Sequence, residues 1–113
     1  MHIDKYKAVV DGTELFNKSN IHSTYSLLDL STYLLLPINY NRIRVYYEGD
    51  KPIGLITWCW LSPTQSELFL IDEYEPVEED YQRENPEGDY LLWGIEFIAP
   101  YGHTRQMARS FRK

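Results

Sequence analysis

The sequence predicts an α/β fold in which helices flank a mostly antiparallel sheet. Three observations carry this prediction. Apolar residues recur at helical spacing in the first third of the chain, a β-hairpin signature follows in the middle, and an apolar strand-like run lies near the end. The 113 residues are enough for one hydrophobic core and leave no room for a second. We therefore expect a single domain over residues 1–113.

Two helices are expected first. The stretch "DGTELFNKS" is typical of a helix start, with Asp11 or Thr13 as the N-cap residue. The stretch "STYSLLDLSTYLLLPI" places apolar side chains near helical spacing, which predicts a second helix from about Thr24 to Leu35. Pro37 should end that helix, because proline lacks the N–H that a helix interior requires.

Strands dominate the rest of the chain. In "RIRVYYEGDKPIGLITWCWLS", β-branched and aromatic residues flank the turn residues "EGDKP", which indicates a hairpin. "SELFLIDEY" predicts a third strand, and the acidic stretch after it a loop with room for one helical turn. "YLLWGIEFIAP" is apolar on both faces and predicts a fourth strand at the centre of the sheet. "GHTRQMARSFRK" predicts a last helix with Met107 and Phe111 on one side. This order of elements is typical of an acetyltransferase-like (GNAT-like) domain.

Charge is unevenly distributed along the sequence. The net charge is −6, and residues 67–89 hold ten carboxylates against one basic residue. The last nine residues contain Arg105, Arg109, Arg112 and Lys113 and no acid. An acidic protein is a poor partner for nucleic acid, because phosphate contacts require clustered lysine and arginine. The basic end could engage an acidic protein, and the acidic stretch is most simply a solvated surface.

The sequence also bears on compartment and cofactors. It has no run near the ~20 apolar residues of a membrane span and no apolar signal-peptide region at its start. The single cysteine, Cys59, fits a reducing cytoplasm, and its "WCW" strand context favours a buried, unreactive thiol. The sequence contains no Gly-rich phosphate loop, CxxC or HExxH motif, so we expect no metal site and no bound cofactor.

A few ionisable residues are candidates for chemistry. His22 lies in the polar segment "SNIHSTY", and histidine is the commonest general base because its usual pKa is near neutral. His103 could simply cap the last helix, and His2 lies at the terminus. Glu96 has only apolar neighbours in "LLWGIEFIAP", where a carboxylate is costly unless it is paired. It is therefore a functional candidate, unless it points to a solvated face of the sheet.

Three stretches resemble the toxin-activating lysine acyltransferases, the family that attaches fatty acids to RTX protoxins in the bacterial cytoplasm. "SNIHSTY" resembles the family's Ser-x-x-His segment with an aromatic residue three positions later. "GDKPIGLITWCWLS" resembles its hairpin strand. "LLWGIEFIAPYG" resembles the strand in which a tryptophan precedes an acidic residue by three and Ala-Pro-aromatic-Gly follows. The resemblance covers about Leu15 to Lys113 and indicates a short, divergent member.

The resemblance implies roles for individual residues. His22 falls on the family's catalytic histidine, which would take a proton from the acceptor lysine as general base. Glu96 falls on its catalytic aspartate, with one methylene more, and would orient and stabilise the imidazole. Backbone amides near the "APYG" turn would stabilise the oxyanion. The supporting positions are Ser19, the aromatic positions Trp58 and Trp93 of the core or acyl channel, and Tyr101 and Gly102.

The resemblance also implies partners. The donor would be acyl carrier protein, and the lack of a Gly-rich loop for the coenzyme A pyrophosphate agrees with this. The acidic carrier would meet Arg105, Arg109 and Arg112 of the last helix. The acceptor would be an internal lysine of a protoxin-like target protein. A homodimer is also possible in this family. Its members typically continue past the position of Lys113, and that further part could hold dimer contacts.

Two alternatives to this function stay open. One is a non-catalytic, acyltransferase-like binding protein of a phage or mobile element, which engages a host protein through acidic residues 67–89. The other is an acyltransferase that acts on a different, small molecule. A contact between His22 and Glu96 would favour catalysis over mere binding.

Overall fold

The computed structural model describes residues 4–20, 22–84 and 87–111. A long first helix is followed by three consecutive short helical segments, a hairpin, two more short helices, a third strand and a last helix. Their bounds are α1 Lys5–Lys18, α2 Leu27–Leu30, the π-helical turn η1 Ser31–Leu35, α3 Leu36–Asn39, β1 Ile43–Glu48, β2 Lys51–Leu61, α4 Pro63–Leu70, α5 Glu78–Gln82, β3 Leu91–Ile98 and α6 Thr104–Phe111.

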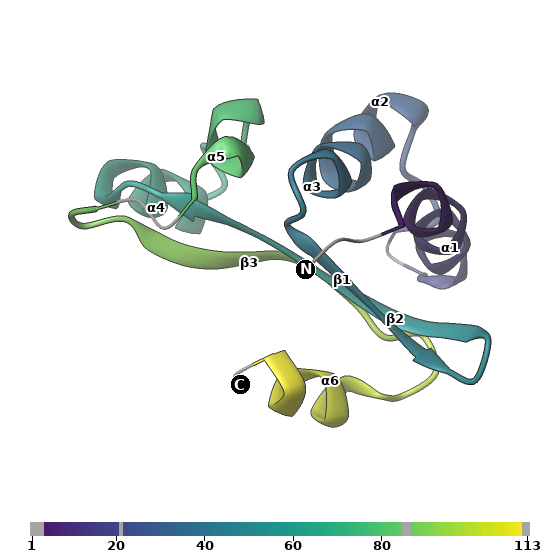
Figure 1. Ribbon diagram of the computed structural model, residues 1–113. Helices are drawn as coiled ribbons and strands as arrows, with labels where there is room; N and C mark the ends of the chain where they lie inside the picture. The colour runs from purple at the N-terminus through teal and green to yellow at the C-terminus, as the bar shows by residue number, and fades with distance from the viewer. Residues whose placement is uncertain (1–3, 21, 85–86, 112–113) are drawn as a thin grey trace.

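The strands form one antiparallel sheet in the order β1-β2-β3 (Figure 1). This confirms the α/β class, with helices flanking an antiparallel sheet, and is compatible with a GNAT-like domain. The predicted hairpin is confirmed as β1 and β2. The prediction of a central last strand is wrong: β2 lies in the centre and is buried along most of its length. Strand β3 exposes Leu91, Leu92 and Phe97, so its apolar composition does not reflect burial on both faces.

The prediction of a third strand in "SELFLIDEY" is also wrong, because the first five residues of this segment form the end of helix α4. Ser62 Oγ accepts from the Gln65 N–H at 3.1 Å, and the Gln65 side chain accepts from the Ser62 N–H at 2.9 Å. Pro63 occupies the first turn. This capping box with an early proline is a helix-start signal, and here it outweighs the strand-like composition. The helical turn expected in the acidic stretch is confirmed as α5.

The first two helices differ from their predicted limits. Helix α1 begins at Lys5 because Asp4 is its N-cap and accepts from the Lys7 N–H at 3.0 Å, so Asp11 and Thr13 lie inside the helix. The second helical region starts at Leu27 and runs on through α3. Pro37 does not end it, because it occupies the first turn of α3, directly after the π-helical turn. Such a turn changes the backbone hydrogen-bond register, which removes the demand for an N–H at the proline.

The sheet has helices on both faces (Figure 1). Helices α1 to α5 lie on one face, and α6 lies alone on the other. Helix α6 approaches the sheet closely at Gly54, where an added Cβ would lie only 2.2 Å from Met107 Sδ. Met107 is fully buried, and the Phe111 ring packs on Trp58 with centroids 5.4 Å apart. The predicted last helix is therefore confirmed, with its apolar side on the sheet.

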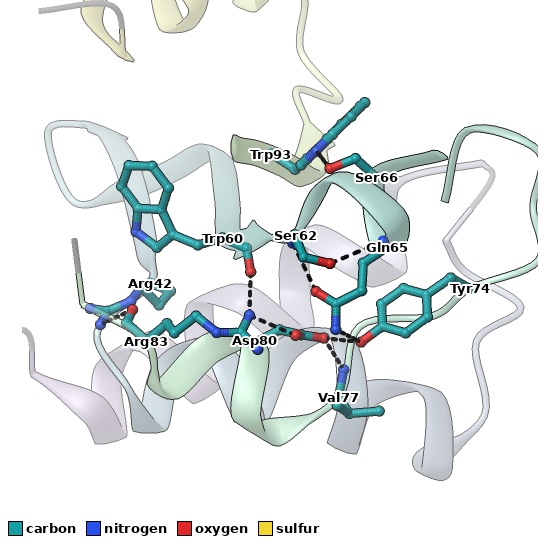
Figure 2. Close-up of polar contacts among 10 residues, drawn as sticks. All are labelled: Arg42, Trp60, Ser62, Gln65, Ser66, Tyr74, Val77, Asp80, Arg83 and Trp93. Carbon is teal, nitrogen blue, oxygen red and sulfur yellow. Dashed lines mark hydrogen bonds and ion pairs between the residues drawn. The ribbon is translucent and has the colours of Figure 1, made fainter. Parts of the chain in front are cut away.

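A buried polar network ties α4 and α5 to the end of β2 (Figure 2). The Asp80 carboxylate is fully buried and accepts from the Tyr74 hydroxyl at 2.5 Å and the Val77 N–H at 2.9 Å. The Arg83 guanidinium donates to Asp80 at 2.9 Å and to the Trp60 carbonyl at 2.7 Å. Three of these bonds converge on the Asp80 carboxylate, so we expect this part of the fold to depend on Asp80.

Over the described ranges, no helix is both long and apolar enough to cross a membrane. The same part of the chain contains no group of three or more histidine, cysteine, aspartate or glutamate side chains arranged to hold a metal ion.

Candidate functional site

His22 and Glu96 meet although 74 positions separate them in the sequence. His22 lies in the loop between α1 and α2, and Glu96 lies in β3. His22 Nε2 is 2.5 Å from Glu96 Oε2, and the two side chains are only 12% and 8% exposed. Glu96 therefore points to the face of the sheet that α1 to α5 cover, and its side chain is shielded from solvent. A short contact of this kind, shielded from water, can hold an imidazole in one orientation.

The Glu96 carboxylate is held at its second oxygen as well. The Tyr25 hydroxyl donates to Oε1 at 3.0 Å, and the Glu96 backbone N–H donates to Thr57 Oγ1 at 3.0 Å. Thr57 is fully buried in β2, at an irregularity in the β2–β3 register between Ile56 and Trp58. The irregularity frees the Glu96 amide from the ladder, and the threonine hydroxyl takes the place of a strand partner.

The His22 ring is fixed from the other side by the end of α1. Ser19 is the C-cap residue of α1, and its Oγ lies 2.6 Å from His22 Nδ1. The ring stands edge-on to Phe16 with centroids 5.4 Å apart and is tilted against Tyr25 at 5.1 Å. Both ring nitrogens therefore have a partner, and two aromatic rings restrict rotation of the imidazole.

The tyrosines around Glu96 stay protonated well above neutral pH. Burial raises the pKa of Tyr25, and the Glu96 carboxylate raises it further. Burial also raises the pKa of Tyr33 to about 12, with help from the Glu75 carboxylate. A neutral tyrosine hydroxyl can donate a hydrogen bond to a carboxylate. Tyr25 is consequently a permanent donor to Glu96 in any neutral buffer.

The two tryptophans of the predicted site do not join His22 and Glu96. Trp58 lies on the opposite face of the sheet, where it packs on Phe111. Trp93 lies beside α4, where its Nε1 donates to Ser66 Oγ at 2.8 Å (Figure 2). Its ring also meets Phe69 edge-on, with centroids 5.4 Å apart. Trp93 belongs to the hydrophobic cluster around Cys59, Leu61 and Tyr81.

The turn after β3 is closed by a backbone hydrogen bond between two of its own residues. The Gly102 N–H donates to the Ala99 carbonyl at 3.2 Å, and the positive φ of 90° at Gly102 favours glycine. The Tyr101 ring lies under Lys51 Nζ, 3.8 Å from the ring centroid. The Gly102 amide is therefore occupied and does not stand free to bind an oxyanion.

The basic residues lie away from the His22–Glu96 pair. Arg105 and Arg109 are exposed on α6, across the sheet from His22, and Arg112 lies outside the described residues. His103 Nε2 is 3.6 Å from Glu48 and does not join the pair. His2 also lies outside the described residues.

Cys59 is fully buried, and burial raises the pKa of its thiol to about 12. The thiolate is the reactive form, so we expect no alkylation of the folded protein by iodoacetamide at pH 8. In urea the thiol should regain its usual pKa near 8.5 and react within minutes. Intact-mass spectrometry of both samples measures this. Rapid alkylation of the folded protein would contradict the buried position.

Sequence reasoning missed two residues of this site. The motif around His22 contains Tyr25 but indicates no role for its hydroxyl, and Thr57 lies in a strand that is otherwise apolar. Thr57 carried a usable signal, because a polar residue in the apolar strand "IGLITWCWL" is as anomalous as Glu96 in its own strand. Nothing in the sequence pairs Tyr25 with Glu96, since only the fold brings the two together.

Comparisons with known proteins place the chain in a family. The model of the RTX toxin acyltransferase family matches residues 2–113. A leukotoxin-activating lysine-acyltransferase of Aggregatibacter actinomycetemcomitans is 29% identical over 99 residues, which cover 88% of this chain and 56% of the relative. A protein-lysine myristoyltransferase of Kingella kingae is 24% identical over 111 residues, which cover 98% of this chain and 64% of the relative. The chain thus spans about three fifths of the length of these relatives.

Proposed function

Because the chain belongs to the RTX toxin acyltransferase family, we propose that it is a protein-lysine acyltransferase. In this proposal it moves a fatty acyl group from acyl carrier protein to an internal lysine of a protoxin-like target protein. The observation that carries the proposal is the 2.5 Å contact between His22 and Glu96, which are held in place by Ser19 and Tyr25. Both relatives' names describe lysine acylation, and one specifies myristoyl transfer.

The first step of the proposed reaction is removal of a proton from the acceptor lysine by a general base. A lysine side chain is protonated at neutral pH and cannot attack a thioester in that form. His22 would take the proton, which leaves a neutral amine to attack the carbonyl carbon. The nitrogen–carbon bond forms, the carbon–sulfur bond breaks, and the proton on His22 passes to the departing thiolate. The nitrogen, which carries a positive charge after it bonds to carbon, releases its second proton to solvent, and a neutral amide remains. Glu96 would stabilise the imidazolium that exists between the two proton transfers.

The proposed donor partner would dock away from this pair. Carrier proteins are acidic, and Arg105 and Arg109 present exposed positive charge on α6. Helix α6 covers the opposite face of the sheet from α1 and α2 (Figure 1). The acyl arm of a carrier bound there would therefore have to pass an edge of the sheet to reach His22.

Mass spectrometry of acylated lysines tests the proposal. Bacterial cells would express this chain or its His22→Ala variant, with and without the protoxin gene of a relative as a defined acceptor. We expect an acyl mark that appears with the wild-type chain and vanishes with the variant. Identical acylation in both cultures, at equal protein levels, would overturn the proposal. The search would then turn to proteins that bind acidic residues 67–89.

Replacing Tyr25 with Phe should lower kcat about 10- to 100-fold and leave the fold intact. The change removes one hydrogen bond to a charged group, worth about 1.5–3 kcal/mol. The Tyr46→Phe variant is the matched control, because the Tyr46 hydroxyl donates to the Met107 carbonyl, at 3.4 Å on the other face of the sheet. Steady-state rates of both variants provide the measurement. Equal rates in the two would show that Tyr25 does not support Glu96.

A further inference from the structure

The two nitrogens of His22 lie in different surroundings. Nε2 faces the Glu96 carboxylate, whose side chain is 8% exposed, and Tyr25 occupies the other carboxylate oxygen. Nδ1 faces the hydroxyl of Ser19, which is half-buried and followed by the exposed residue Asn20. The Nδ1 side thus lies next to half-buried Ser19 and exposed Asn20, which makes it the side from which we expect an acceptor lysine to arrive.

The partners of the two ring nitrogens indicate which one carries the proton when Glu96 is ionised. An ionised carboxylate is acceptor-only, so Nε2 must donate to Glu96. A neutral imidazole then has its lone pair on Nδ1, and the Ser19 hydroxyl donates to it across 2.6 Å. The Ser19 oxygen also accepts from the His22 backbone N–H at 3.4 Å, which keeps the hydroxyl beside the ring.

We propose that Nδ1 of His22 is the basic nitrogen and that the Ser19 hydroxyl relays the proton of the acceptor amine to it. This rests on the proposed acyl transfer. The ammonium group of the lysine gives a proton to Ser19 Oγ while the Ser19 O–H proton moves to Nδ1. The imidazolium keeps its Nε2–H on Glu96, and the amine is free to attack the thioester. After the carbon–sulfur bond breaks, the same relay returns this proton to the thiolate, and the amide nitrogen releases its remaining extra proton to solvent.

The first test needs no activity and therefore stands apart from the proposed function. The chain is labelled with ¹⁵N-histidine, and the His22 signals are assigned by their loss in a His22→Gln variant. We expect an Nε2–H tautomer at neutral pH, with Nδ1 at the chemical shift of an unprotonated nitrogen. An Nδ1–H tautomer overturns the proposal, whether or not the chain transfers acyl groups.

The second test asks whether Nδ1 and Ser19 act in the reaction. We expect Nδ1-methylhistidine at position 22 to reduce activity to that of His22→Gln, since the methyl group blocks the basic nitrogen. Ser19→Ala should lower kcat at least tenfold with little change in the KM of the acceptor, and Ser19→Thr should recover most of it. Full activity with the methylated ring, or with Ser19→Ala, overturns the proposal. If the wild-type chain transfers nothing, the proposed function fails and the tautomer alone decides the nitrogen assignment.

Discussion

Replacing Glu96 with Gln is expected to lower kcat for acyl transfer by about a thousandfold or more, the scale seen when the carboxylate of a catalytic triad becomes an amide. The amide has nearly the size of the carboxylate, so the Tyr25 and Thr57 contacts can persist. It lacks the charge that stabilises an imidazolium, however, and its NH₂ group can face Nε2 as a donor. The His22 tautomer then reverses, and the base is lost.

Glu96→Asp is the matched control for this change. It keeps the charge but withdraws the carboxylate from His22 by about 1 Å, a displacement that can cost a hundredfold in rate. We expect the order Glu, then Asp, then Gln in kcat, measured with purified variants, acyl-loaded carrier protein and an acceptor protein. Circular dichroism must show the same fold for all three. A Gln variant as active as the Asp variant would show that the negative charge at this position plays no part.

Removing the buried carboxylate of Asp80 should have the largest effect on stability. In Asp80→Ala, the Arg83 guanidinium, the Tyr74 hydroxyl and the Val77 N–H lose a common partner (Figure 2). Breaking a buried ion pair by deleting one partner costs about 3–5 kcal/mol, because the remaining charge stays uncompensated. Urea denaturation at pH 7 measures the free energy of unfolding.

The neighbouring residue supplies the control. Glu79 occupies the same turn of α5 but is exposed, so Glu79→Ala should change the free energy of unfolding by less than about 0.5 kcal/mol. A loss below about 1 kcal/mol for Asp80→Ala would show that the network is not a centre of stability. The acidic stretch therefore contains at least one carboxylate, Asp80, that is buried and hydrogen-bonded inside the fold. The interpretation of residues 67–89 as a solvated surface does not hold for this residue.

The fold was predictable where local signals agree. The hairpin carries turn residues and β-branched flanks, and the last helix carries its apolar pair, so both could be found from sequence. The "SELFLIDEY" segment has the composition of a strand, but the Ser-Pro-x-Gln start that precedes it is a helix-start signal and outweighs that composition. The position of β3 failed for another reason: exposed Leu91, Leu92 and Phe97 look like core residues in a sequence, and only the tertiary structure shows them at the surface.

The candidate site divides in the same way. His22 and Glu96 could be named because a motif and an isolated carboxylate mark them, and the structure brings their side chains into contact. The aromatic positions were harder, since the alternation of a strand decides its faces. Thr57 points to Glu96, whereas the next residue, Trp58, points to α6. Tyr25 required the path of the loop between α1 and α2, which no local pattern specifies.

The separation of His22 and Glu96 along the chain would make the proposed activity a late event in folding. One residue precedes the hairpin and the other lies in the last strand, so the loop between them closes only after β3 has paired with β2. Synthesis of the first 90 residues would yield helices and a hairpin without a working pair. During refolding, enzymatic activity should recover no earlier than the slowest spectroscopic phase. Recovery of activity would then show that β3 has paired with β2, whereas recovery of the helical signal would not.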